Sequence, residues 1–218
     1  MKKLIIAISS AFMILTTSAM SMDLRPSIGI SGNYAAYAAT GIENNYNEAG
    51  SAIDTTTKEY GAFSAEFGSV FVEMALSDVI SVGVDYVPMT LETPKNTANI
   101  NETNVNHVEA HFEDLTTVYA KINVPLGGTY LKVGYSQVEV ISIENMSSGN
   151  SYGNDNSSGM TVGLGYNHEV ASGISVRAEV TASEFSDVTT NNGQTNKTEI
   201  KVEDMIGARG TISIVKSF

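Results

Sequence analysis

The last seven residues of the sequence, Ile212-Ser-Ile-Val-Lys-Ser-Phe218, end an alternating segment that decides the fold. Apolar side chains recur at every second position, and mostly polar side chains stand between them. This alternation predicts a β-strand with one apolar and one polar face. The apolar face carries Ile206, Ala208, Ile212, Ile214 and Phe218, and the opposite face carries Arg209, Thr211, Ser213 and Ser217.

The same period of two recurs from Leu24 onward and predicts seven more strands. Helical spacing does not fit these stretches, and Gly and β-branched residues are too frequent in them for good helices. In the second strand we expect one apolar face formed by Phe63, Ala65, Phe67, Ser69 and Phe71. The eight predicted strands span residues 27–38, 60–75, 80–91, 108–124, 129–143, 159–170, 174–184 and 206–218.

The connections between these strands alternate between short and long. Residues 76–79, 125–128 and 171–173 have the length and composition of tight turns. The gaps at 39–59, 92–107, 144–158 and 185–199 are longer and polar. Outer-membrane barrels combine short periplasmic turns with longer outer loops. The pattern therefore predicts an all-β protein, an eight-stranded antiparallel up-and-down transmembrane β-barrel with both ends on the periplasmic side.

The first residues have the features of a cleaved signal peptide. Lys2 and Lys3 precede an apolar segment that is too short to span a membrane as a helix, and small residues follow it. We expect cleavage after Ala19, with Ser21 as the alternative, so that residues 1–19 are removed and 20–218 form one barrel domain. Loss of the two lysines leaves ten basic against 24 acidic residues, a net charge of about −14. This balance argues against nucleic acid as a partner.

A membrane barrel has the opposite polarity to a soluble protein. Its apolar face contacts lipid and its polar face lines the lumen, because every backbone group must pair inside the closed wall. We expect Phe71, Tyr166 and Phe218 to form the periplasmic aromatic girdle, with Phe63 and Tyr86 nearer the outer one. An eight-stranded lumen is narrow enough for side chains to fill it. The charged residues predicted to line a plugged lumen are Asp85, Lys121, Lys132, Arg177, Glu179 and Arg209.

The chain resembles the eight-stranded outer-membrane barrels of Gram-negative bacteria, the group of the OmpA membrane domain, OmpX, OmpW and the opacity-type surface proteins. The resemblance rests on the architecture and on the closing strand that ends at Phe218. It implies location in the cell outer membrane, in contact with the lipid bilayer and lipopolysaccharide. It also implies that Phe218 is the signal read by the barrel-assembly machinery. No stretch identifies one subfamily, and no periplasmic domain follows the barrel.

Few residues suggest chemistry. His107, Glu109, His111 and Glu113 share one face of a strand and could gather around a divalent cation, although a solvated polar stretch above the membrane is the preferred explanation. His168 falls near a periplasmic turn, where an interfacial role is the simpler explanation. Asn154-Asp155-Asn156 offers oxygen ligands for calcium but lacks the rest of a calcium loop. We therefore expect no catalytic residue, metal or cofactor.

The predicted function is a structural or surface-interaction role in envelope integrity or adhesion, with the long loops offering a site for an extracellular ligand. A narrow channel for small solutes is the alternative. A lipid-modifying barrel enzyme would need a nucleophile close to a histidine and a carboxylate. A soluble lipocalin-like barrel would be the structural alternative, with apolar residues inside instead of outside.

Overall fold

The computed structural model describes residues 24–94, 96–99, 105–145, 151–194 and 197–218. The predicted signal peptide and both of its cleavage sites lie outside these residues. Within these residues, eight strands form one antiparallel ring, and three shorter strands of two to four residues extend it. The ring strands are β1 (Arg25–Tyr46), β2 (Ile53–Ala75), β3 (Ile80–Tyr86), β6 (Val105–Asn123), β7 (Thr129–Asn145), β8 (Asp155–Ala171), β9 (Ile174–Phe185) and β11 (Thr198–Ser217).

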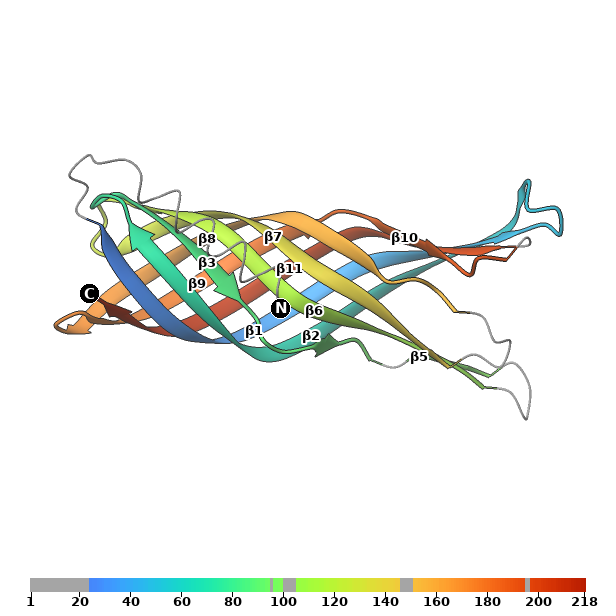
Figure 1. Cartoon of the computed structure of the whole chain (residues 1–218), viewed down its shortest axis with the longest axis horizontal. Helices are drawn as coiled ribbons and strands as arrows, with labels where there is room; N and C mark the ends of the chain where they lie inside the picture. The colour runs from blue at the N-terminus through green and yellow to red at the C-terminus, as the bar shows by residue number, and fades with distance from the viewer. Residues whose placement is uncertain (1–23, 95, 100–104, 146–150, 195–196) are drawn as a thin grey trace.

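The ring closes because β1 pairs with β11, and Ile30 lies opposite Ile214 in that ladder. The short strands β4 (Leu91–Glu92) and β5 (Asn96–Asn99) pair with β6, and β10 (Val188–Asn191) pairs with β11. Figure 1 shows the strands winding obliquely around a common axis. The prediction of an eight-stranded antiparallel barrel is confirmed.

The short turns lie at the end of the barrel that also holds the C-terminus (Figure 1). Gly127, Gly128 and Gly173 all adopt positive φ there, a conformation that glycine reaches at little cost. At Gly173 a side chain would also meet the carbonyl oxygen of Ser217 at 2.8 Å. In outer-membrane barrels short turns face the periplasm, so the opposite end is the extracellular one.

The strands run further at the extracellular end than the sequence predicts. Most of the segment 39–59, which was expected to be a loop, forms paired strands. β1 and β2 stay paired from Gly41 opposite Glu59 to Tyr46 opposite Ile53. The expected loop at 185–199 contains β10 and the start of β11. These segments lack clean alternation because water lies on both of their faces. In Figure 1 they project beyond the barrel together as one arm, because β1 and β11 stay paired as far as Asn45 opposite Thr198.

The wall is apolar outside, as predicted for a membrane barrel, and polar inside over its periplasmic half. Ile30 and Val180 on the outer face are each 61% exposed, whereas Arg177 on the inner face is 6% exposed. The outer row includes Val118, Leu131, Val133, Val162, Leu164, Ile212 and Ile214. An apolar surface of this extent around a closed wall suits contact with lipid. Within the described residues, no helix is long and apolar enough to cross a membrane.

Strand β2 is the exception, because the predicted face is reversed. Phe67 and Phe71 point into the lumen, and Val70 and Val72 point outward. Phe71 fits inside because Gly29 of β1 lies beside it; a Cβ on Gly29 would be 2.2 Å from the ring. The girdle positions predicted for Phe63 and Phe71 are therefore wrong, while Tyr166 and Phe218 do lie exposed on the outer surface.

The ladder between β2 and β3 is short. It joins Val70–Ala75 only to Ser81–Tyr86, and β3 ends at Tyr86 instead of continuing to 91 as predicted. Beyond Tyr86 the chain stays beside β6, its partner in the ring: Val87 donates its N–H to the Leu115 carbonyl, and Leu91 lies opposite Phe112. Within the described residues, β2 from Ile53 to Ser69 therefore has no strand partner on this side.

The reversed face of β2 gives a test. Replacing Val70 with Lys puts a charge on the lipid-facing side of the strand. The free energy of unfolding from lipid vesicles, measured by denaturant titration, should fall by about 2–4 kcal/mol. The control Leu126→Lys lies in an exposed turn and should change it by less than about 0.5 kcal/mol. Equal effects of the two substitutions would contradict the assigned face.

Candidate functional site

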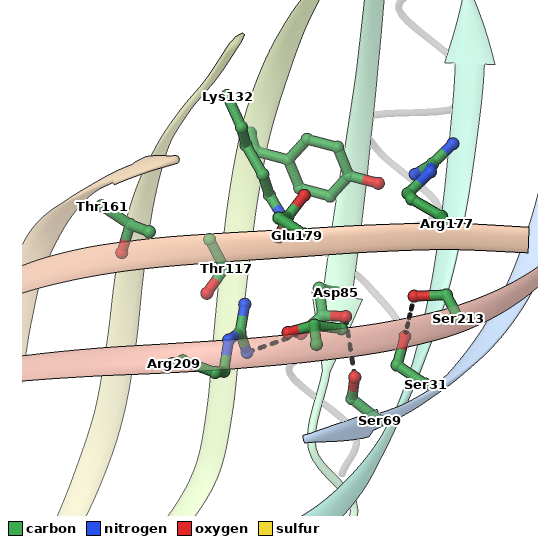
Figure 2. A network of polar contacts seen from close by, with 12 residues as sticks. Ser31, Ser69, Asp85, Thr117, Lys132, Thr161, Arg177, Glu179, Arg209 and Ser213 are labelled. Atoms are coloured by element: carbon green, nitrogen blue, oxygen red, sulfur yellow. Dashed lines mark hydrogen bonds and ion pairs between the residues drawn. The ribbon is translucent and has the colours of Figure 1, made fainter. Parts of the chain in front are cut away.

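The lumen has two levels with different chemistry. The periplasmic half holds buried charged and hydroxyl side chains, and the extracellular half holds an apolar cluster and a cavity. All six residues predicted to line the lumen, Asp85, Lys121, Lys132, Arg177, Glu179 and Arg209, lie in the charged level. Figure 2 shows five of them converging from different strands.

Glu73 of β2 is the centre of this charged level. Arg177 approaches it with both terminal nitrogens, at 3.0 Å and 3.3 Å, and Lys121 forms a second ion pair with it. Tyr119 donates its hydroxyl to the same carboxylate at 3.1 Å. Fork-to-carboxylate contacts of this kind are strong and geometrically specific. Sequence reasoning missed Glu73, because the outer face predicted for Phe67 and Phe71 would also have exposed Glu73 to lipid.

Glu179 of β9 organises a second cluster beside the first. It accepts hydrogen bonds from Lys132 at 2.8 Å and from the Tyr130 hydroxyl at 2.9 Å. The Lys132 ammonium also lies 4.2 Å from the centre of the Tyr119 ring, which in turn contacts Glu73. A cation over an aromatic face is stabilised most when both are shielded from water. The two carboxylates are thus joined into one network.

A third pair joins β3 to β11. Arg209 lies 3.4 Å from Asp85, and Asp85 also accepts a hydrogen bond from Ser69 at 2.9 Å (Figure 2). Nearby, Ser31 and Ser213 share a hydrogen bond of 2.9 Å across the closing ladder. These contacts join the closing strand β11 to β3 across the lumen and to its neighbour β1. The lumen is therefore cross-linked by polar contacts along this level.

Together these side chains form what we call the ionic plug: Glu73, Asp85, Lys121, Lys132, Arg177, Glu179 and Arg209. Four cations meet three carboxylates. Charges removed from water are costly unless each has a partner of good geometry. A row of hydroxyls adjoins the plug, running from Thr117 through Ser136 and Thr161 to Ser183 at 2.8–2.9 Å. The arrangement places buried, partnered side chains in the periplasmic half of the lumen.

The extracellular half is apolar. Ala35, Phe67, Val87, Leu91, Leu115 and Val138 form a buried cluster, and Tyr37, Phe112, Val140 and Phe185 pack against it. Beside this cluster lies a cavity of about 440 Å³. Among the described residues that line it, Glu59 is the one charged side chain. No sequence signal predicted this level, because alternation predicts a polar interior along the whole strand.

The predicted histidine cluster does not form a closed site. His111 Nε2 lies 3.7 Å from Glu109 and 4.0 Å from Glu92, while Glu113 accepts a hydrogen bond from Thr90. The side chain of His107 is outside the described residues. Among the side chains that are described, no group of three His, Cys, Asp or Glu residues is arranged to hold a metal ion.

The two other candidates are also local. His168 is exposed, and its ring stacks on Tyr166 with centroids 6.4 Å apart. This placement suits the interfacial role predicted for it. Asp155 caps the backbone of its neighbour Asn156 at 2.7 Å at the start of β8. Neither contact brings catalytic groups together.

Comparison with known proteins supports the fold. No protein-family model matches the sequence, and no curated protein sequence matches it. Among solved structures, the outer membrane protein OprG from Pseudomonas aeruginosa is similar, with 14% identity, a TM-score of 0.54, and coverage of 88% of this chain and 95% of that one. The outer membrane protease OmpT from Escherichia coli matches over 93% of this chain and 99% of its own, with 10% identity and a TM-score of 0.48.

The closed eight-stranded wall, its apolar outer surface and its charged interior define an outer-membrane β-barrel. The protein therefore has the fold of the family predicted from its sequence, and it belongs in the outer membrane. One prediction needs correction. The expectation that the chain is not an enzyme is not upheld, because a protease is among the barrels that match it. The barrel fold does not decide whether the chain is an enzyme, and 10% identity transfers no activity.

The plug gives a stability test. Glu73→Gln removes the charge that neutralises Lys121 and Arg177, which leaves two buried cations without their partner. The free energy of unfolding in lipid vesicles should fall by about 3–5 kcal/mol. The control Asp78→Asn breaks the exposed pair with Arg25, whose side chains are 91% and 46% exposed. Its effect should be below about 1 kcal/mol. A loss for Glu73→Gln no larger than this control would contradict a central role for Glu73.

Proposed function

We propose that this outer-membrane barrel binds small apolar molecules in the extracellular half of its lumen, above a plug that closes the periplasmic half. The cavity of about 440 Å³ carries the proposal. Ligand pockets usually span about 300–1,000 Å³ and are lined mainly by apolar and aromatic side chains with few polar groups. This cavity has both properties.

The cavity wall supports the proposed ligand class. Phe63, Phe112, Val138, Val140 and Phe185 all line it. A molecule that replaces water against these side chains gains about 25 cal/mol for each Å² of apolar surface that is buried. A charged or strongly polar solute would lose hydration here without regaining hydrogen bonds. The site therefore favours apolar molecules over ions and sugars.

The interrupted wall supports access from the side. Residues on both edges of the unpaired stretch line the cavity. On one edge they are Tyr60 to Phe63 of β2, and on the other they are Leu91, Thr93 and Pro94, which follow β3 in the chain and lie beside β6. Met89 covers part of this stretch, since its sulfur accepts the N–H of Gly68 at 3.3 Å. An apolar molecule dissolved near the outer leaflet could enter here without crossing the plug.

Binding can be measured with the apolar dye N-phenylnaphthylamine, whose fluorescence rises in apolar surroundings. The protein in lipid nanodiscs should show saturable binding, above that of empty nanodiscs. Ala110→Trp puts a large side chain into the cavity and should weaken binding at least tenfold. Ala120→Trp is the matched control, because it lies on the same strand but on the outer face of the wall. Absence of saturable binding, or equal binding by both variants, would refute the proposal.

The plug also opposes the alternative function of a channel. Glu73, Glu179 and their cationic partners occupy the periplasmic half of the lumen. In planar bilayers we expect no steady conductance from the wild-type protein. Steady single-channel conductance, altered by neutralising Lys132 or Arg177, would show that the plug is permeable and would favour the channel.

A surface-interaction role is the second candidate. The observation that favours it is the projection of β1, β2, β10 and β11 beyond the apolar wall (Figure 1). This arm is mostly polar and would present an extended surface outside the cell. Phe218 suits its proposed role as the signal for the barrel-assembly machinery, since it is 73% exposed on the outer face and its N–H donates to Pro26.

A further inference from the structure

The cavity wall contains a row of nearly parallel aromatic rings. Tyr37 of β1 stacks on Phe63 of β2 with centroids 5.3 Å apart and an interplanar angle of 27°. Phe63 stacks in turn on Phe112 of β6 at 5.7 Å and 11°. We call these three side chains the ring stack. All three line the cavity, and Phe185 of β9 lines it as well.

The wall holds the ring stack in place. Gly207 lies opposite Tyr37 in the closing ladder, and a Cβ there would come within 2.7 Å of the Tyr37 ring. Strands β2 and β6 are not neighbours in the barrel, and Phe63 stacks on Phe112 at the level where β4 pairs with β6. The stack therefore crosses the inner side of the interrupted wall. Its orientation is set by the backbone and not by a flexible loop.

The parallel rings matter for the choice of ligand. Aromatic side chains stack in offset arrangements or pack edge to face, and either gives about 0.5–1.5 kcal/mol beyond the burial of their area. A row of offset-stacked rings can accept one more flat ring in the same manner. A saturated ligand of equal size would fill the same space but would gain only the area term.

We infer that the cavity selects flat aromatic molecules over aliphatic ones of similar size, with the ring stack as the recognition element. This inference rests on the proposed function, because it names the ligand class of the same cavity. Tyr37, Phe63 and Phe112 are the specificity-determining residues. The remaining apolar lining supplies affinity that both classes of molecule share.

Naphthalene and decalin provide a matched pair of probes. They share one carbon skeleton, but naphthalene is flat and aromatic whereas decalin is saturated and puckered. Each is titrated against bound N-phenylnaphthylamine on the wild-type protein in nanodiscs. After correction for partition into the lipid, naphthalene should displace the dye about threefold to tenfold more effectively than decalin.

Variants then assign the selectivity to the ring stack. Phe112→Leu and Phe63→Leu keep an apolar side chain but remove a ring, so they should weaken naphthalene binding toward that of decalin while leaving decalin unchanged. Tyr135→Leu is the control, since Tyr135 is an exposed aromatic residue on the outer face. Heat-modifiable gel mobility establishes that each variant forms a barrel, and either leucine variant suffices for the test.

The outcomes separate the two proposals. Equal displacement by naphthalene and decalin would overturn aromatic selectivity and leave the apolar site standing. Retained preference for naphthalene in both leucine variants would overturn the role of the ring stack. Failure of the dye to bind the wild-type protein would refute the proposed function itself. Preference for naphthalene that is lost in the leucine variants and kept in Tyr135→Leu supports the inference.

Discussion

Backbone groups that cross hydrocarbon must pair within the protein, and the ladder between β1 and β11 is the pairing on which the structure depends. Without it two strand edges would face lipid, each unpaired group costing several kcal/mol. Closure also fixes every inward side chain on a narrow tube. The ladder shifts register between Ala38 and Thr40, where Asp204 on β11 adopts positive φ. Irregularities of this kind are common at the rims of barrels. Beyond this bulge the strands leave the closed tube and continue as a projecting arm.

A tube of eight strands must be filled by its own side chains, and this chain fills it in two ways. Near the periplasm the filling is ionic, and Glu73 neutralises two cations at once. Near the outside it is apolar, with Phe67 and Leu115 at the centre of the cluster. The ionic half needs complete partnering, since a buried charge that loses its partner destabilises strongly. The apolar half tolerates incomplete filling, because an apolar cavity can remain empty of water. A binding cavity is therefore least costly in the extracellular half.

Alternation and connection length were enough to predict the closed barrel, because lipid on one side forces one face of every strand to be apolar. The same rule placed Arg177 and Glu179 on the inner face, where the structure buries them. It failed on β2, where both faces carry apolar residues: Phe67 and Phe71 on one, Val70 and Val72 on the other. Glu73 lies on the same face of β2 as Phe71. The high cost of a carboxylate in lipid was the signal that could have identified this face as the inner one. The aromatic interior had no such signal, since a period of two reports which residues share a face but not what fills a lumen. The predicted strands also ended too early at the extracellular side. Paired strands that have water on both faces need no alternation of apolar and polar residues, so the sequence pattern did not report them.

The position of the wall interruption follows from the two kinds of filling. The β2–β3 ladder covers Val70 to Ala75, which spans the position of Glu73. At that level an unpaired stretch would admit water or lipid to the buried ion pairs, and their strength depends on being shielded from solvent. Further toward the extracellular end of β2, the inward residues are Phe67, Ala65 and Phe63. Contact with lipid costs these apolar side chains little. The ladder can therefore end at Val70 without weakening the plug. The chain that follows β3 continues beside β6, away from β2, and Phe63 of β2 stacks on Phe112 of β6 at this level. The ionic level, which keeps its ladder, thus permits the laterally interrupted apolar level, and this second level holds the cavity that we propose as the binding site.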